Sequence, residues 1–167
     1  KGAALATGSE LAEVRVLAAA HQSHHNKALA ELAMKNIELV GMPAWSEEDH
    51  QFARELQKEL GKPEKGMPEK VGSLGKPAVV FVGGASSDHG DVTLIAPTAT
   101  IRFPGRIPGS QGHHWSTVTS GYGSTSWKGL NAGAKAMAAT AVDLLTKPDV
   151  LQSVRQEFDE YSKKHPY

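Results

Sequence analysis

The feature that most constrains the fold is an apolar run that leads directly into glycines and a small polar loop. The run covers residues 78–82, the glycines are Gly83 and Gly84, and the loop covers residues 86–91. A run that is apolar at every position predicts a strand buried on both faces, as in the interior of an α/β sheet. A strand that ends in a loop with hydroxyl and carboxylate groups is a typical way to build a site. We therefore expect an α/β fold with a site within residues 83–115.

Three further segments are expected to be extended. Residues 10–20 alternate imperfectly between apolar and polar, so a short helix is the alternative there, and residues 98–103 alternate more clearly. Residues 116–119 form a short β-prone piece.

Four helices are predicted from apolar periodicity and from residues that start or end helices. Asn26 is expected to cap the first helix, and Gly41 to end it. The sequence from Ser46 to Asp49 resembles a capping box, and Pro148 suits the first turn of the last helix. The side chains expected to face inwards are Leu29, Leu32, Ala33, Asn36, Ile37 and Val40, then Phe52, Ala53, Leu56 and Leu60, then Leu130, Ala134, Met137, Ala138, Ala141 and Leu145, and finally Leu151, Val154, Phe158 and Tyr161.

Composition excludes several classes of protein. The 18 Lys and Arg residues equal the 18 Asp and Glu residues, so a nucleic-acid or anionic-membrane surface is not expected. The absence of cysteine excludes disulfides and thiolate zinc sites, and it fits a cytoplasmic protein. No apolar run approaches the ~20 residues of a membrane helix. Because the chain begins at Lys1 rather than at Met, we expect a fragment or a processed chain.

The eight histidines are the most suggestive ligands in a chain without cysteine. On an extended piece, the adjacent rings of His113 and His114 would point to opposite faces, so at most one would face a site. One interpretation is a single metal ligand, and the alternative is a polar loop histidine. The three imidazoles of His21, His24 and His25 likewise suit either a metal or a solvated turn.

The polar loop before residue 92 also has two interpretations. Ser87 and Asp88, with nearby backbone N–H groups, would cradle a substrate carboxylate or stabilise an oxyanion. Alternatively, the two side chains satisfy the local backbone in a turn. The tripeptide from His89 to Asp91 imitates a metal-binding His-x-Asp, which we attribute to chance.

Several motifs together resemble the dinuclear zinc amidohydrolases and carboxypeptidases related to aminoacylase, and among them the aminobenzoyl-glutamate hydrolase-like branch. The motifs are a Ser-Ser-Asp-x-Gly-Asp-Val loop within residues 83–92, Pro-Thr at 97–98, Gly-His-His-Trp at 112–115, and residues 128–138. Residues 21–41 are similar to the end of the family's lid domain. The resemblance covers nearly the whole chain, but only the C-terminal portion of the family.

The resemblance implies an architecture and a chemistry. Residues 1–42 would end an α/β, ferredoxin-like lid domain that mediates homodimerisation, and residues 43–167 would end a mixed-sheet α/β catalytic domain. The complete family protein holds two divalent metals, zinc or alternatively manganese or cobalt. A metal-bound hydroxide, with a Glu as general base, hydrolyses the amide of an acyl-amino acid or dipeptide-like substrate.

The resemblance also assigns residues. His113 matches the last metal ligand of the family, and Ser87 and Asp88 match its substrate-side loop. His21 and Asn26 match lid positions that approach the substrate, often from the partner subunit. From residue chemistry alone, however, Asn26 is a helix cap.

The sequence departs from the family pattern in its reactive groups. The family's first His-x-Asp, its bridging ligand and its Glu-Glu pair lie upstream of what this chain contains, and Glu47-Glu48 opens a helix and does not match that pair. Catalytic zinc needs about three protein ligands, and this chain supplies one, so no catalytic residue is expected here. His24-His25 replaces the apolar-Pro pair usual before Asn26. Two alternatives stay open: a non-catalytic binding or assembly module, and a histidine-based metal-binding protein.

Overall fold

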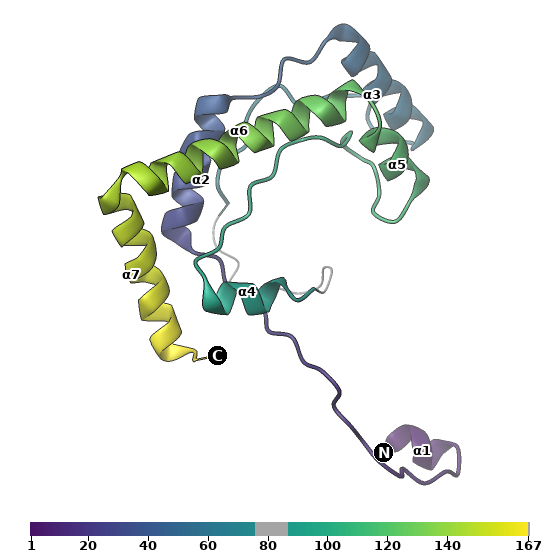
Figure 1. Ribbon diagram of the computed structural model, residues 1–167. Helices are drawn as coiled ribbons and strands as arrows, with labels where there is room; N and C mark the ends of the chain where they lie inside the picture. Colours follow the sequence, from purple (N-terminus) through teal and green to yellow (C-terminus); the bar gives the residue numbers. More distant parts are fainter. Residues whose placement is uncertain (76–86, 167) are drawn as a thin grey trace.

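The computed structural model describes residues 1–75 and 87–166, which form helices joined by irregular segments (Figure 1). Helix α6 lies across the top of an open arch, with α2 and α7 at one end and α3 and α5 at the other (Figure 1). The helices are α1 (Gly2–Ala6), α2 (Lys27–Val40), α3 (Glu47–Glu59), α4 (His89–Ile95), α5 (Trp115–Gly121), α6 (Ser124–Thr146) and α7 (Pro148–Lys164).

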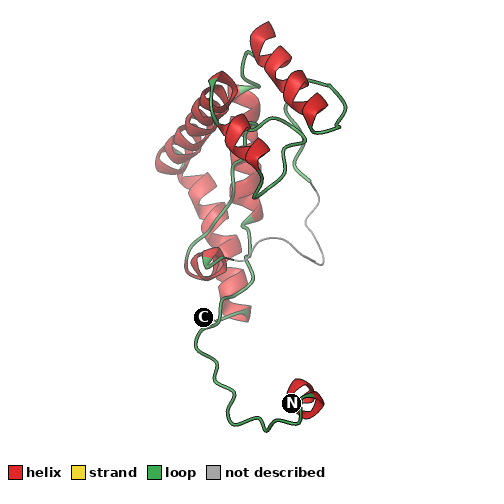
Figure 2. Cartoon of the chain, turned by 90° about the vertical axis from the view of Figure 1, so that its right-hand side faces the viewer, coloured by secondary structure: helices red, strands yellow, loops and turns green. Residues whose placement is uncertain are grey.

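The predicted α/β fold with a mixed sheet is wrong, because the described residues contain helices and no strand (Figure 2). Residues 10–20 are irregular and exposed, residues 98–103 are irregular, and residues 116–119 lie within α5. A strand is stable only when its backbone groups pair with a neighbour, and the described part of the chain offers no such neighbour. The apolar run at residues 78–82 lies outside the described residues.

The predicted helix ends are confirmed, because they depend on local chemistry. The Asn26 side chain accepts a hydrogen bond from the backbone N–H of Leu29, and α2 ends at Gly41 with a φ of 72°. Ser46 and Asp49 form both halves of a capping box at the start of α3. Pro148 is the first residue of α7, where its missing N–H has no helical partner to lose.

The best-packed part of the molecule, which we call the α3 corner, surrounds one face of α3. Ala53 and Leu56 pack with Met67 and Ile107, and Trp45, Phe52 and Leu60 cover this cluster. The periodicity of α3 therefore predicted its buried face correctly. The buried side chain of Gln57 ties the neighbouring loops, because it donates to the carbonyls of Gly66 and Pro108 and accepts from Gly66 N–H.

Helix α6 buries a different face from the predicted one. Its buried residues are the small ones: Thr125, Gly129, Ala132, Ala136 and Thr140. A Cβ at Gly129 would lie 2.4 Å from the carbonyl oxygen of Pro104, so only glycine allows this close approach. The predicted inner residues, from Leu130 to Leu145 at helical spacing, are exposed instead. The face with small side chains is the buried one, because small side chains let α6 approach its neighbours closely.

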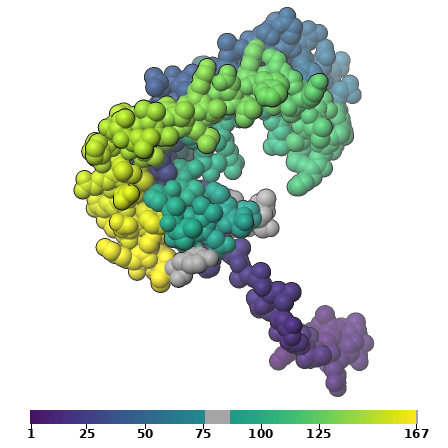
Figure 3. Space-filling view, viewed as in Figure 1, coloured from purple at the N-terminus to yellow at the C-terminus, as the bar shows by residue number. Residues whose placement is uncertain are grey.

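The predicted domain boundary at residues 42/43 stays a prediction. Helix α2, on one side of it, packs against α6 and α7 on the other side. In the space-filling view the inside of the arch is open between α4 and α5 (Figure 3). None of the described helices has the length and apolar character needed to cross a membrane.

Candidate functional site

Four of the five predicted site residues lie around one junction, which we call the α4 junction. It consists of residues 21–26, residues 87–95 with α4, and the C-terminal half of α7. Gly90 of α4 lies directly against the chain at His21, since a Cβ on it would be 1.7 Å from the His21 carbonyl oxygen. The structure therefore joins two segments almost seventy residues apart, while their predicted role in binding a substrate stays a prediction.

His21 is held against α4 by Asp91. Its Nδ1 lies 2.8 Å from Asp91 Oδ1, and its backbone N–H donates to the same oxygen at 3.3 Å. The hydrogen bond from the His21 side chain lowers the pKa of the Asp91 carboxyl. This pairing orients the imidazole at the edge of the junction, where its side chain is about 58% exposed.

Asn26 occupies a structural position. Besides capping α2, its Nδ2 donates to the Val154 carbonyl at 3.0 Å, and its backbone N–H donates to the Thr98 carbonyl at 2.8 Å. Its side chain is buried. Glu157 of α7 completes the end of α2 by accepting hydrogen bonds from the N–H groups of Lys27 and Ala28, where a carboxylate also complements the helix dipole. The cap is thus confirmed, and the substrate role of Asn26 stays a prediction.

Ser87 and Asp88 are exposed and lead into α4. Ser87 Oγ accepts from the N–H of His89, and the Asp88 carbonyl accepts from the N–H of Asp91. These contacts form the turn that the sequence offered as the alternative to a substrate cradle. Both side chains are exposed, so this turn is compatible with the predicted substrate cradle.

A stack of rings that the sequence did not predict completes the junction. The rings of His24 and Tyr161 are parallel with centroids 3.4 Å apart, and the ring of His165 lies 4.4 Å beyond Tyr161. Burial lowers the pKa of His24, although Glu157 opposes the shift. Nothing local in the sequence could reveal this stack, because more than 130 residues separate its two ends.

An open pocket of about 410 Å³ lies beside this stack. The described residues that line it include an ammonium, two imidazoles and a phenol but no carboxylate, although Asp91 pairs with the ring of His21 beside it. Such groups suit an anionic ligand such as a carboxylate, because cationic donors form charge-assisted hydrogen bonds. The lining residues are His21, Gln22, Leu94, Tyr161, Lys164, His165 and Pro166.

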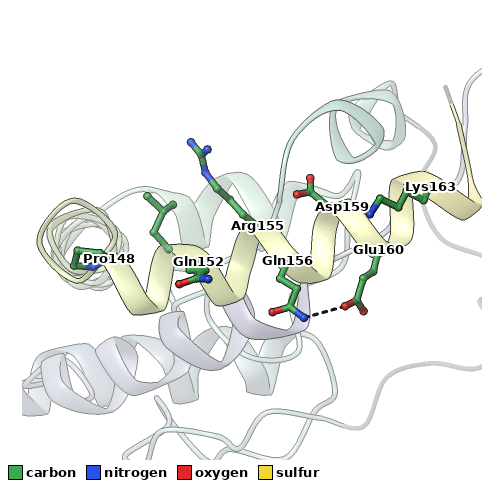
Figure 4. Close-up of a pocket in the computed structure, with 8 residues that line it drawn as sticks. Pro148, Gln152, Arg155, Gln156, Asp159, Glu160 and Lys163 are labelled. Atoms are coloured by element: carbon green, nitrogen blue, oxygen red, sulfur yellow. Dashed lines mark hydrogen bonds between the residues drawn. The ribbon is translucent and has the colours of Figure 1, made fainter.

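A second hollow runs along the outside of α7 (Figure 4). Its lining residues all belong to α7, and they carry both signs of charge: Arg155 and Lys163 against Asp159 and Glu160. A hollow beside one helix with balanced charge offers no converging groups, so it is a weaker candidate than the α4 junction.

His113 lies apart from the other predicted residues. It precedes α5, which Figure 1 shows on the other side of the arch from α4. His113 is exposed with a φ of 55°, which is rare for a residue other than glycine. Therefore His113 and His114 do not alternate on an extended piece as predicted. His114 instead caps α5, since its side chain accepts from the N–H of Ser116.

The described residues do not form a metal site by themselves. No three His, Asp or Glu side chains in the described part of the chain lie close enough together to hold a metal ion. A catalytic zinc needs about three protein ligands and an open position. His113 is exposed, and its role as a metal ligand stays a prediction.

Comparison with known proteins confirms the resemblance seen in the motifs. The chain is 28% identical over 190 residues to a protein of Escherichia coli (strain K12) that is named as one of the subunits of p-aminobenzoyl-glutamate hydrolase. The match covers the whole of this chain and 39% of the relative, so the chain spans about two fifths of the length of that protein. No family model matches the chain, and no solved structure matches it.

Proposed function

We propose that the chain is one part of a metal-dependent hydrolase that cleaves the amide bond of an acyl-amino acid or dipeptide-like substrate, with p-aminobenzoyl-glutamate as the model compound. The observation that carries the proposal is the similarity, along the whole chain, to one of the subunits of a p-aminobenzoyl-glutamate hydrolase. The chain would form the C-terminal part of the longer polypeptide.

In this proposal the chain binds and orients the substrate but does not carry out the reaction alone. N-acyl amino acids carry a free carboxylate, and the described lining of the pocket at the α4 junction includes an ammonium and two imidazoles. His21, Asn26, Ser87 and Asp88 would lie on the substrate side. The exposed polar residues that line this pocket include His21, Gln22, Lys164 and His165.

The metal chemistry would depend on the rest of the polypeptide. Two divalent ions, zinc or alternatively manganese or cobalt, would supply an activated water, and His113 would be one ligand. The other ligands and the general base would come from outside this chain, so the isolated chain would be inactive. We further propose a homodimer and a cytoplasmic location, on the basis of the resemblance and of the absence of cysteine.

A second candidate function is a binding or assembly module that retains the similarity without the chemistry. It is favoured by the lack of three converging metal ligands within the described residues. Under this alternative the carboxylate-binding pocket would still act, but no longer polypeptide would complete a metal centre around His113.

The experiment that tests the proposal uses a hybrid protein, in which this chain replaces the matching stretch of the E. coli relative. With added zinc, and with the rest of the E. coli hydrolase, the hybrid should release p-aminobenzoate from p-aminobenzoyl-glutamate. His113→Ala should lower kcat/KM at least about a hundredfold, since even residues that only orient metal ligands contribute about 10–100-fold. His25→Ala is the matched control and should retain activity.

A folded hybrid without activity would contradict the hydrolase proposal and favour the binding module. Equal activity of the His113 and His25 variants would contradict the role of His113 alone. Folding is checked independently by circular dichroism, so loss of structure and loss of chemistry are told apart.

A further inference from the structure

Helix α6 has two opposite apolar faces, and the described residues cover one of them. The covered face is the stripe of small residues that includes Gly129, Ala132 and Ala136, which packs on α2 and on the segment around Gly105. The uncovered face carries the large side chains. Trp127, Leu130, Met137 and Leu145 are 71%, 62%, 62% and 84% exposed, respectively.

The uncovered face is continuous along the helix. Leu130, Met137 and Leu145 recur at spacings of 7 and 8 residues, which is close to two turns of a helix each time. Alanines at exposed positions fill the turns between them: Ala134, Ala138 and Ala141. None of these side chains is charged. Helix α5, which contacts α6, and the residue that follows it add three more exposed apolar or aromatic side chains: Trp115, Val118 and Tyr122.

A helix that is apolar on opposite sides is typical of the interior of a larger protein. Exposed apolar patches of this extent mark an interaction surface, because folded proteins seldom leave them in water. The absence of charge from the α6 stripe favours a permanent interface, which resembles a protein core, over a transient one.

The length of the relative indicates what covers this face. The matched E. coli protein extends well beyond this chain, which accounts for 39% of it and leaves the larger part outside. We propose that the outer face of α6, with Leu130, Met137 and Leu145 at its centre, docks the remaining part of the same polypeptide. This inference rests on the proposed function only in taking the chain to be part of a longer protein.

The test exploits the absence of cysteine from the chain. A single cysteine is introduced by Met137→Cys, on the outer face, or by Lys135→Cys, an exposed control two residues away. Each variant is labelled with a maleimide, both as the isolated chain and within the hybrid protein, and the peptide that carries residue 135 or 137 is quantified by mass spectrometry. Thiol labelling follows exposure.

We expect both positions to be labelled in the isolated chain, and position 137 alone to lose labelling in the hybrid. Labelling of position 137 in the folded hybrid would overturn the inference. If position 137 of the isolated chain loses labelling at high protein concentration, and sedimentation shows a dimer, the inference is overturned. The outer face of α6 would then bind a second copy of this chain.

Thermal stability provides a second test that needs no cysteine and no labelling. Met137→Glu should lower the thermal midpoint of the hybrid but leave that of the isolated chain unchanged, whereas Lys135→Glu should change neither. Equal thermal midpoints for the hybrid with Met137→Glu and the hybrid with Lys135→Glu would overturn the inference. Neither readout uses hydrolysis, so a hybrid that folds, protects position 137 and lacks activity would contradict the proposed function and leave this interface standing.

Discussion

The α3 corner and the α4 junction are held together by different kinds of interaction. In the α3 corner a buried apolar cluster is surrounded by satisfied polar groups, such as Gln57 and the ion pair between Lys128 and Asp49. In α4, by contrast, the only buried residues are Gly90 and Thr93. The junction therefore depends more on hydrogen bonds and ring stacking than on buried apolar side chains.

This difference separates stability from candidate function. Burial of large apolar side chains provides most of the free energy of folding, and here the buried apolar cluster lies in the α3 corner and not in the α4 junction. Segments with few buried apolar contacts open at low free-energy cost. The α4 junction is such a segment, and it presents the groups suited to bind a carboxylate. The predictions below test whether the two regions differ in this way.

The largest effect is expected from Ile107→Ala in the α3 corner. Ile107 is 1% exposed and belongs to the buried cluster, so its truncation should lower the free energy of unfolding by about 2–5 kcal/mol. Urea denaturation followed by far-ultraviolet circular dichroism measures the change. The matched control is Leu145→Ala on the exposed face of α6, where the change should stay within about 0.5 kcal/mol. Similar losses in both variants would show that the α3 corner is no better packed than α6's outer face.

An intermediate effect is expected from Gly90→Ala in the α4 junction. The added Cβ would meet the His21 carbonyl oxygen at 1.7 Å, so residues 21–22 must move away, at a cost of about 1–3 kcal/mol. Hydrogen exchange should speed up at residues 21–26 and stay unchanged in α3. Gly72→Ala, where nothing lies within 4 Å of the added Cβ, should leave both regions as they are. Unchanged exchange at residues 21–26 would place His21 elsewhere.

The smallest effect is a difference in response to acid. The pKa of His24 lies below its ordinary 6.5, so the unfolded chain binds the proton more readily. The contribution of His24 is therefore present above pH 6.5 and is lost as the pH falls from 6.5 through the folded pKa. For Asp49, burial raises the pKa, but hydrogen bonds from Lys128 and Ser46 lower it overall below 3.8. Its contribution persists down to about pH 3.8 and is lost below that value.

Hydrogen exchange between pH 7 and 4 should therefore show the His24–Tyr161 contact loosening while α3 stays protected. His24→Phe, which retains the stacked ring without a titrating group, should remove the loosening. Simultaneous loss of protection in both regions would contradict the distinction between them.

Local signals in the sequence predicted most of the helices. Asn26, the pair Ser46 and Asp49, and Pro148 determine helix ends through bonds to residues within one turn. The strands were predicted wrongly, because strand formation depends on a partner that residues 10–20 and 98–103 do not have among the described residues. The inner face of α6 was also mispredicted, since side-chain size, not hydrophobicity alone, determined which stripe was buried.

The candidate site was predictable as residues but not as an arrangement. Motif resemblance singled out His21, Ser87 and Asp88, which the structure brings to one junction. The pairing of Asp91 with His21 and the stacking of Tyr161 on His24 could not be predicted, because each joins residues 70 or more positions apart. The separation of His113 from the α4 junction could not be predicted either, because it depends on how distant helices pack.

The central claim is that this chain provides one ligand to a metal centre that only a longer polypeptide completes. Elemental analysis for zinc, after dialysis, on the isolated chain and on the hybrid protein tests it most directly. We expect well under one zinc per isolated chain and about two per hybrid, as in two-metal hydrolases, with less in the hybrid that carries His113→Ala. Two tightly bound zinc ions on the isolated chain would contradict the claim.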